Sequence, residues 1–138
     1  MRRVRIRTDD GVFGGQYDNG TVKTNGRRYT VGEDAELLAP CEPTAMYCIG
    51  RNYAKTVDQM GYERPERPDW FIKPPVSVHP PDQPLAYPSW TDELTYAGEL
   101  AAVIDKHCSD LSVDDVDDTI RGYTILNDHG ALHKNGRT

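Results

Sequence analysis

The sequence predicts a mixed α/β fold that is rich in β-strands, with a small N-terminal β-meander followed by part of a larger mixed sheet. Turn dipeptides punctuate the first 39 residues, and all ten prolines fall between Pro40 and Pro88. Residues 93–138 form the most regular part of the chain. We therefore expect an N-terminal domain at residues 1–39 and a second, incomplete domain at residues 40–138, whose first part (40–92) is rich in loops.

The N-terminal domain is predicted from short alternating runs separated by turn signals. Residues 4–7 alternate between apolar and basic side chains, as one strand with a buried face does. Asn19-Gly20 and Asn25-Gly26 are the strongest short signals for two-residue hairpin turns. A short acidic helix at residues 34–38 is expected to close the domain.

Two short apolar strands and one helix are expected in the proline-rich middle of the chain. Residues 46–49 and 70–72 are predicted to be strands, the first ending at Gly50 and the second at Lys73-Pro74-Pro75. Residues 53–60 are predicted to be a helix that Gly61 limits. Long loops of this kind in compact domains are either functional lids or disordered segments.

A strand–helix–strand core is expected at residues 93–138. Residues 94–104 are predicted to be a buried strand, and residues 122–127 a second one. Between them, Ser112 resembles an N-cap, with Asp114 and Asp115 in the first turn of a helix that reaches residue 120. The order of these elements indicates a βαβ-like unit with a short helix.

The composition is typical of globular proteins, and the net charge disfavours some classes of binding partner. Of 138 residues, 37% are hydrophobic and 28% are charged. The net charge of −6 argues against nucleic acid or an anionic membrane as the main partner. Asp outnumbers Glu by 15 to 7 and Arg outnumbers Lys by 11 to 5, which is typical of haloarchaeal proteins kept soluble in high salt, although −6 is also ordinary for a mesophile.

The cysteines and the N-terminal segment indicate that the protein resides in a reducing cytoplasm. The three cysteines are an odd number without a Cys-x-x-Cys pair, so neither a disulfide framework nor a zinc knuckle is expected. The basic start lacks the apolar core of a signal peptide, and no apolar run approaches the length of a membrane span.

Two carboxylates on the predicted strands are the first candidate site. Alternation places Glu99 on a strand face of small side chains that includes Ala97, and Asp128 lies where the second strand ends. If the strands are neighbours, the two carboxylates converge and suit Mg²⁺ or Mn²⁺, which accept oxygen ligands and retain waters. The alternative is that Glu99 pairs with Arg51 or Arg121 and that Asp128 caps a turn.

Four segments, in this order, resemble signatures of the fumarylacetoacetate hydrolase family. They are residues 48–54 (CIGRNYA), 71–74 (FIKP), 96–101 (YAGELA) and 122–128 (GYTILND). The resemblance implies a rolled mixed β-sheet, with Mg²⁺ or Mn²⁺ held by a Glu-x-Glu pair and by the Asp of Asn-Asp. It also implies a homodimer or higher oligomer that hydrolyses, decarboxylates or isomerises small oxo acids in aromatic and oxo-acid catabolism.

Three residues of the first two signatures are candidates for binding an anionic substrate. Arg51 and Tyr53 follow Gly50 at a strand end, and Lys73 precedes Pro74-Pro75 after an apolar island. Their structural alternatives are an ion pair for Arg51, a core phenol for Tyr53 and a solvated surface position for Lys73.

The sequence departs from the family pattern at three places. Ala97 stands where the first Glu of Glu-x-Glu is expected and cannot coordinate a metal; Glu93, about 13 Å along the strand, is too far away to replace it. Thr56 and Gln59 stand where a His/Glu pair is expected, and neither accepts a proton near neutral pH. The chain ends at Thr138, before further family segments, which indicates C-terminal truncation.

His129 and His133, which are four residues apart, are candidates for a zinc site, with His107 and Cys108 earlier in the chain. Gly130 favours a loop instead, with both C-terminal histidines exposed to solvent.

The residues lead to two functional hypotheses. The first is a metal-dependent enzyme acting on small oxo acids, in which decarboxylation or isomerisation is favoured over hydrolysis because the water-activating pair is missing. The second is a catalytically inactive truncated homologue that binds a small acid or a partner subunit.

Overall fold

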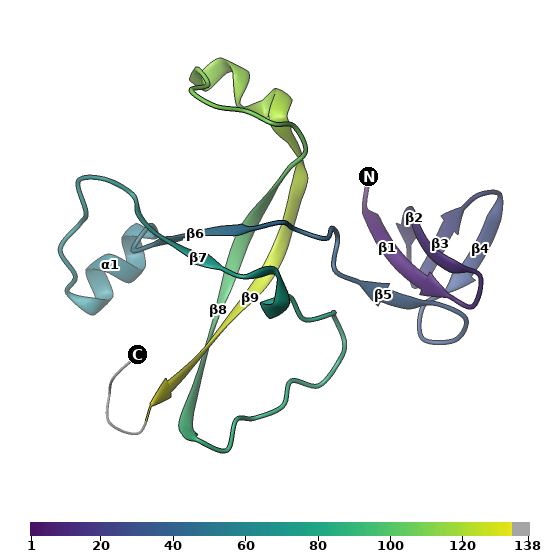
Figure 1. Ribbon diagram of the computed structural model, residues 1–138, viewed down its shortest axis with the longest axis horizontal. Coiled ribbons are helices and arrows are strands. Elements are labelled where there is room, and N and C mark those ends of the chain that lie inside the picture. Colours follow the sequence, from purple (N-terminus) through teal and green to yellow (C-terminus); the bar gives the residue numbers. More distant parts are fainter. Residues whose placement is uncertain (134–138) are drawn as a thin grey trace. The chain divides into compact units, whose positions relative to one another are not determined.

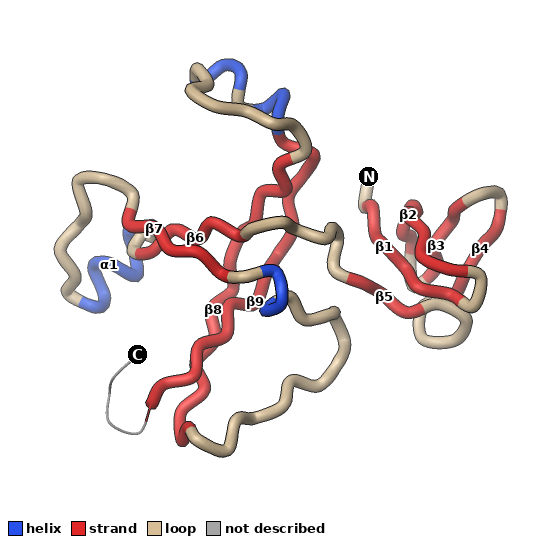
Figure 2. The backbone as a smooth tube through the Cα atoms, in the orientation of Figure 1, coloured by secondary structure: helices blue, strands red, loops and turns tan. Residues whose placement is uncertain are grey.

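The computed structural model of the protein describes residues 1–133 and is dominated by antiparallel strands (Figure 1, Figure 2). The chain divides into two compact units, Met1–Gln83 and a second that begins at Pro84. The fold is β-rich and mixed, as the sequence predicts. The division into domains at residues 1–39 and 40–138 stays a prediction.

The first 38 residues form a five-stranded antiparallel sheet with the strand order β4-β3-β2-β1-β5. The strands are β1 (Arg3–Thr8), β2 (Gly11–Asp18), β3 (Thr21–Thr24), β4 (Arg27–Thr30) and β5 (Glu36–Leu38). Asn19-Gly20 and Asn25-Gly26 form the predicted hairpin turns, with φ angles of 44° and 81° in the first and 48° and 74° in the second. These left-handed values are why Asn-Gly closes such turns.

The core of this sheet lies on one of its faces. Ile6 and Val22 have no exposed surface, and Ala35 is 7% exposed. Six partly buried side chains pack against them: Val4, Phe13, Tyr17, Tyr29, Val31 and Leu37.

The prediction of an acidic helix at residues 34–38 is wrong. Residues 36–38 form β5, and Leu37 pairs with Ile6 of β1. Five residues are too few to form a stable helix alone, whereas a strand here satisfies the backbone of β1 and covers the core.

The middle of the chain contains the two predicted strands and the predicted helix. β6 (Met46–Gly50) and β7 (Asp69–Lys73) pair antiparallel, and α1 (Ala54–Met60) lies between them in sequence. A single turn of 3₁₀-helix, η1 (Pro75–Ser77), follows β7. Val57 is the buried residue of α1, and Gly61 ends the helix with a φ of 66°.

Replacing Gly61 with alanine should lower the free energy of unfolding by about 1 kcal/mol, because a Cβ is unfavourable in the left-handed region. Gly14→Ala is the control, since an added Cβ there meets no atom within 4 Å and the backbone is not left-handed. Urea titration followed by circular dichroism measures both. Equal stabilities of the two variants would contradict the assigned helix end.

The second unit is a long antiparallel hairpin of β8 (Thr91–Ile104) and β9 (Ile120–His133). The helix expected at residues 112–120 is wrong: the connection holds two 3₁₀ turns, η2 (Val113–Asp115) and η3 (Asp117–Thr119). Ser112 Oγ donates to Asp115 Oδ2 at 2.7 Å instead of capping a backbone amide. Because the strands run antiparallel, the βαβ-like unit is also wrong.

The expected burial of this strand is wrong as well. Thr91 is the buried residue of β8, at 3% exposed, whereas Tyr96 and Leu100 are 78% and 63% exposed. Two strands alone cover too little of each other's surface to bury apolar side chains on both faces. Among the described residues, no helix is long and apolar enough to cross a membrane.

Candidate functional site

The β8–β9 register places Glu99 and Asp128 on the same face of the hairpin. Ala97 lies opposite Asp128, and Glu99 lies opposite Leu126. In an antiparallel pair, directly opposed side chains share a face, and so do residues two apart along a strand. Glu99 and Asp128 are therefore diagonal neighbours, which in antiparallel sheets lie about 7–8 Å apart.

Small side chains lie on either side of Glu99 along β8, and the larger Leu126 lies opposite it on β9. Along β8 the neighbours of Glu99 are Ala97 and Ala101, and Thr124 of β9 lies opposite Ala101. Glu99 and Asp128 are both half-buried, whereas Ala97 is exposed. The face therefore leaves space at the alanine positions, on the side of Asp128 that faces Ala97, for a cation with its waters or for a small acid.

The alternatives to a metal role receive little support from the geometry. Asp128 lies inside β9, so the expectation that it caps a turn is wrong. Among the described residues, Glu99 forms no ion pair, since Arg121 lies 3.8 Å from Asp105 and Arg51 pairs with Asp69.

The donor set fits a divalent cation only in part. Two carboxylates provide the oxygen ligands that Mg²⁺ and Mn²⁺ prefer. Within residues 1–133, however, no group of three or more His, Cys, Asp or Glu side chains could hold a metal ion. Ala97 stands opposite Asp128 and contributes no donor, so waters or ligand oxygens would have to complete the coordination.

Arg51 has an unusual backbone and a defined partner. Its φ of 49° lies in the left-handed region, which non-glycine residues seldom adopt. Its Nε and Nη2 atoms each lie 3.0 Å from Asp69 Oδ2. Asp69 pairs with Gly50 at the end of the β6–β7 ladder, so the ion pair fixes the chain where it leaves β6.

The other predicted substrate-binding residues lie in the first unit, near the same pair of strands. Tyr53 is the N-cap residue of α1 and is 43% exposed. Lys73 is the last residue of β7 and is half-buried. Thr56 and Gln59 are both exposed on α1 and, three residues apart, share one side of the helix. Glu99 and Asp128 belong to the second unit.

In the part of the chain that the structure describes, the remaining candidates belong to no group of three or more possible metal ligands. His129 lies in β9 opposite Tyr96, on the face away from Asp128, so the loop expected here is wrong. His133 is the last residue of β9, and Cys108 is exposed after β8. Glu93 is exposed near the start of β8, as expected of a solvated strand entrance.

Sequence reasoning missed one group of residues. Lys23, Arg27 and Arg28 line an open hollow of about 380 Å³ at the β3–β4 turn. Their charges are visible in the sequence, but their grouping depends on strand register.

The sequence model of the family described as "Fumarylacetoacetate (FAA) hydrolase C-terminal" matches residues 45–133. The chain belongs to the fumarylacetoacetate hydrolase family. The match contains all four signature segments, together with Glu99 and Asp128.

The chain is similar to relatives that include an oxaloacetate tautomerase. The chain is 43% identical over 106 residues to oxaloacetate tautomerase YisK of Bacillus subtilis, covering 72% of this chain and 35% of that protein. It is 37% identical over 112 residues to Protein Rv2993c of Mycobacterium tuberculosis, covering 81% of this chain and 42% of that protein. The chain thus spans less than half the length of these two relatives.

A solved structure of the family shows the same fold. It is the crystal structure of 5-carboxymethyl-2-hydroxymuconate delta-isomerase from Mycobacterium smegmatis, with a TM-score of 0.79 and 34% identity. The alignment covers 95% of this chain and 55% of that one. The likeness therefore extends to the N-terminal sheet, outside the matched family segment.

Proposed function

We propose that this protein catalyses a divalent-metal-dependent isomerisation or decarboxylation of a small oxo acid, with Glu99 and Asp128 holding Mg²⁺ or Mn²⁺. The observation that carries the proposal is their diagonal placement on one face of β8–β9. A bound cation supplies positive charge beside the carbonyl oxygen at which negative charge develops. The names of the tautomerase and isomerase relatives support this class of reaction.

Hydrolysis is the less favoured reaction. Thr56 and Gln59 occupy the places on α1 where the family resemblance implies a His/Glu pair. Neither side chain takes a proton from water near neutral pH. Tautomerisation and decarboxylation need no activated water, so these reactions depend less on the missing pair.

The proposed substrate contacts rest on the sequence signatures. We assign Arg51, Tyr53 and Lys73 to the carboxylate of the substrate because cations and phenols bind such groups through charge-assisted hydrogen bonds. The ion pair with Asp69 uses Nε and Nη2 of Arg51 on a single oxygen, so Nη1 is the guanidinium nitrogen outside that contact.

Assembly and location belong to the same proposal. We propose a homodimer or higher oligomer, supported by the exposed apolar side chains of one β8–β9 face, where Tyr96 is 78% and Ile125 is 77% exposed. Light scattering of the purified chain measures the oligomer. The odd number of cysteines, without a Cys-x-x-Cys pair, supports a cytoplasmic location.

The test measures the rates at which oxaloacetate and an acylpyruvate react in the presence of the full chain and MnCl₂. The control contains MnCl₂ without protein. We expect faster keto–enol exchange or CO₂ release from oxaloacetate, no cleavage of the acylpyruvate, and a return to the protein-free rate after EDTA. Acylpyruvate cleavage would overturn the preference for isomerisation or decarboxylation. Equal rates with and without protein would overturn catalysis.

A binding protein without turnover is the second candidate, and specific residues favour it. Ala97 lies on the carboxylate face without a donor, and Thr56 and Gln59 lack a base. This candidate predicts that oxalate binds the Mn²⁺-loaded chain, whereas oxaloacetate reacts no faster with the protein than without it. Calorimetry with oxalate beside the rate assay separates the two functions.

A further inference from the structure

Three cations of the N-terminal sheet lie in one row across four strands. Arg3 of β1 pairs with Gln16 of β2, Gln16 pairs with Lys23 of β3, and Lys23 pairs with Arg28 of β4. Directly opposed residues share a face, so all four side chains lie on one face. This face is opposite the core, because Val22 is buried and its neighbour Lys23 is exposed.

These three cations differ from the others of the sheet, which pair with acidic side chains. Within residues 1–133, neither Arg3 nor Lys23 nor Arg28 forms an ion pair. The ion pairs of the neighbouring arginines are Arg5 with Glu42, Arg7 with Glu36 and Arg27 with Asp10. Like charges placed directly opposite each other are unfavourable in a sheet, so Lys23 and Arg28 repel each other until an anion lies between them.

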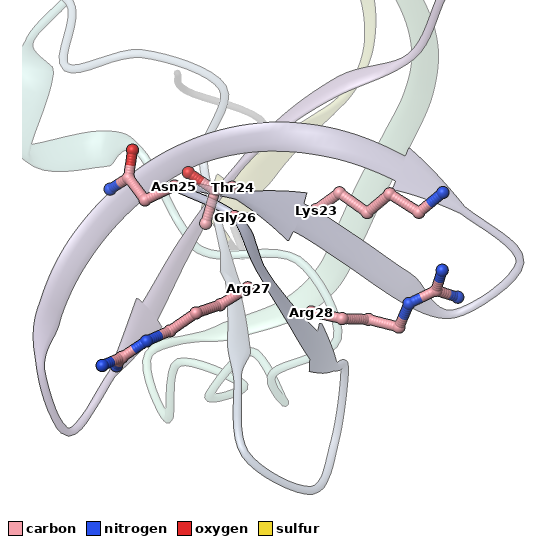
Figure 3. A pocket seen from close by; sticks show the side chains of 6 residues that line it. All are labelled: Lys23, Thr24, Asn25, Gly26, Arg27 and Arg28. Atoms are coloured by element: carbon pink, nitrogen blue, oxygen red, sulfur yellow. The ribbon is translucent and has the colours of Figure 1, made fainter.

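Figure 3 shows that Lys23 and Arg28 extend to the same side of the β3–β4 hairpin, whereas Arg27 extends to the other side. Arg27 is engaged there: a hydrogen bond with Tyr29, with a smaller contribution from Asp10, raises the pKa of its guanidinium. The open hollow of about 380 Å³ at this turn leaves room beside the Lys23–Arg28 pair.

The surroundings of the row limit the chemistry of a ligand. Within two residues of the row along each strand, this face carries Arg5, Gly14, Asp18, Thr21 and Thr30. None of these has an aromatic ring on which a base could stack. Asp18 is the carboxylate among them and forms no ion pair within the described residues.

We propose that the row of Arg3, Gln16, Lys23 and Arg28 is a binding site for a short inorganic phosphate chain, separate from the proposed oxo-acid site. With strands about 4.8 Å apart, Lys23 and Arg28 flank one phosphate and Arg3 lies roughly 10 Å from Lys23, within reach of a second. Gln16 donates a neutral hydrogen bond between them. Residues 1–39 hold seven Lys and Arg against six Asp and Glu, unlike the acidic remainder of the chain.

Tripolyphosphate and orthophosphate, titrated into the full chain at low salt by calorimetry, test the proposal. We expect tripolyphosphate to bind more tightly and both ligands to weaken as salt rises. Lys23→Gln and Arg28→Gln should each weaken both ligands by about fivefold. Arg3→Gln should weaken tripolyphosphate alone, because orthophosphate does not reach β1.

Two variants serve as matched controls. Arg27 also lines the hollow, but it extends to the other side of the hairpin and pairs with Asp10, so Arg27→Gln should weaken binding by less than about twofold. Asp18→Asn removes the carboxylate of this face and should tighten tripolyphosphate about twofold. Absence of tripolyphosphate binding at millimolar concentration, or an equal loss in Arg27→Gln and Arg28→Gln, overturns the proposal.

Discussion

Replacing Ala97 with glutamate is expected to tighten Mn²⁺ binding by roughly 30-fold. Ala97 lies opposite Asp128 and two residues from Glu99, so the variant adds a third carboxylate to this face. Two unit charges 4 Å apart attract by about 1 kcal/mol in water, so a carboxylate and a dication gain about 2 kcal/mol, or a roughly 30-fold lower Kd. Calorimetry with MnCl₂, with and without oxalate, measures the change.

Two control variants separate site geometry from general charge attraction. Gly98→Glu adds the same charge to the opposite face of β8, where an added Cβ meets no atom within 4 Å. Ala97→Gln has the size of the test residue without its charge. Both controls should change the Kd by less than about threefold. If Gly98→Glu tightens Mn²⁺ as much as Ala97→Glu does, the inferred arrangement around Asp128 is wrong.

Local backbone chemistry could be predicted from the sequence. Asn19-Gly20 and Asn25-Gly26 indicate hairpin turns because few other dipeptides adopt two left-handed residues at low cost, and both turns are present. Gly61 marks the end of α1 for the same reason. These predictions succeed because the signal and the structure lie within a few residues of each other.

The predictions that failed depend on distant pairing. Residues 36–38 become β5 because β1 offers an unpaired edge and an apolar face. This pairing cannot be predicted from the short acidic segment itself. Residues 112–120 cross from one strand to its antiparallel neighbour, where two 3₁₀ turns suffice. In both segments, tertiary pairing overrides a weak local preference for helix.

The candidate site could be predicted in part for the same reason. Alternation along a strand puts Ala97 and Glu99 on one face without knowledge of any partner. That Ala97 faces Asp128, and that Lys23 faces Arg28, depends on the registers of separate ladders. A shift of one residue in either ladder would place the paired side chains on opposite faces.

Replacing Ile6 with alanine is expected to destabilise the N-terminal sheet by about 3 kcal/mol. Ile6 has no exposed surface and packs in a small cluster with Val22 and Ala35, so neighbouring side chains can fill little of the cavity. A sheet of this size has little stability to lose. Amide hydrogen exchange of β1–β5 should therefore become roughly 100-fold faster, as measured by mass spectrometry or NMR.

The same experiment tests whether residues 1–39 are a separate domain. If they are, exchange in β8–β9 stays unchanged in Ile6→Ala, because the two segments open independently. Ile72→Ala makes the same chemical change at a side chain that is 54% exposed and lies outside the proposed oligomer face, and it should alter stability by less than about 0.5 kcal/mol. Faster exchange in β8–β9 by the same factor as in β1–β5 would show that the described chain unfolds as one cooperative unit, and the boundary at residue 39 would be wrong.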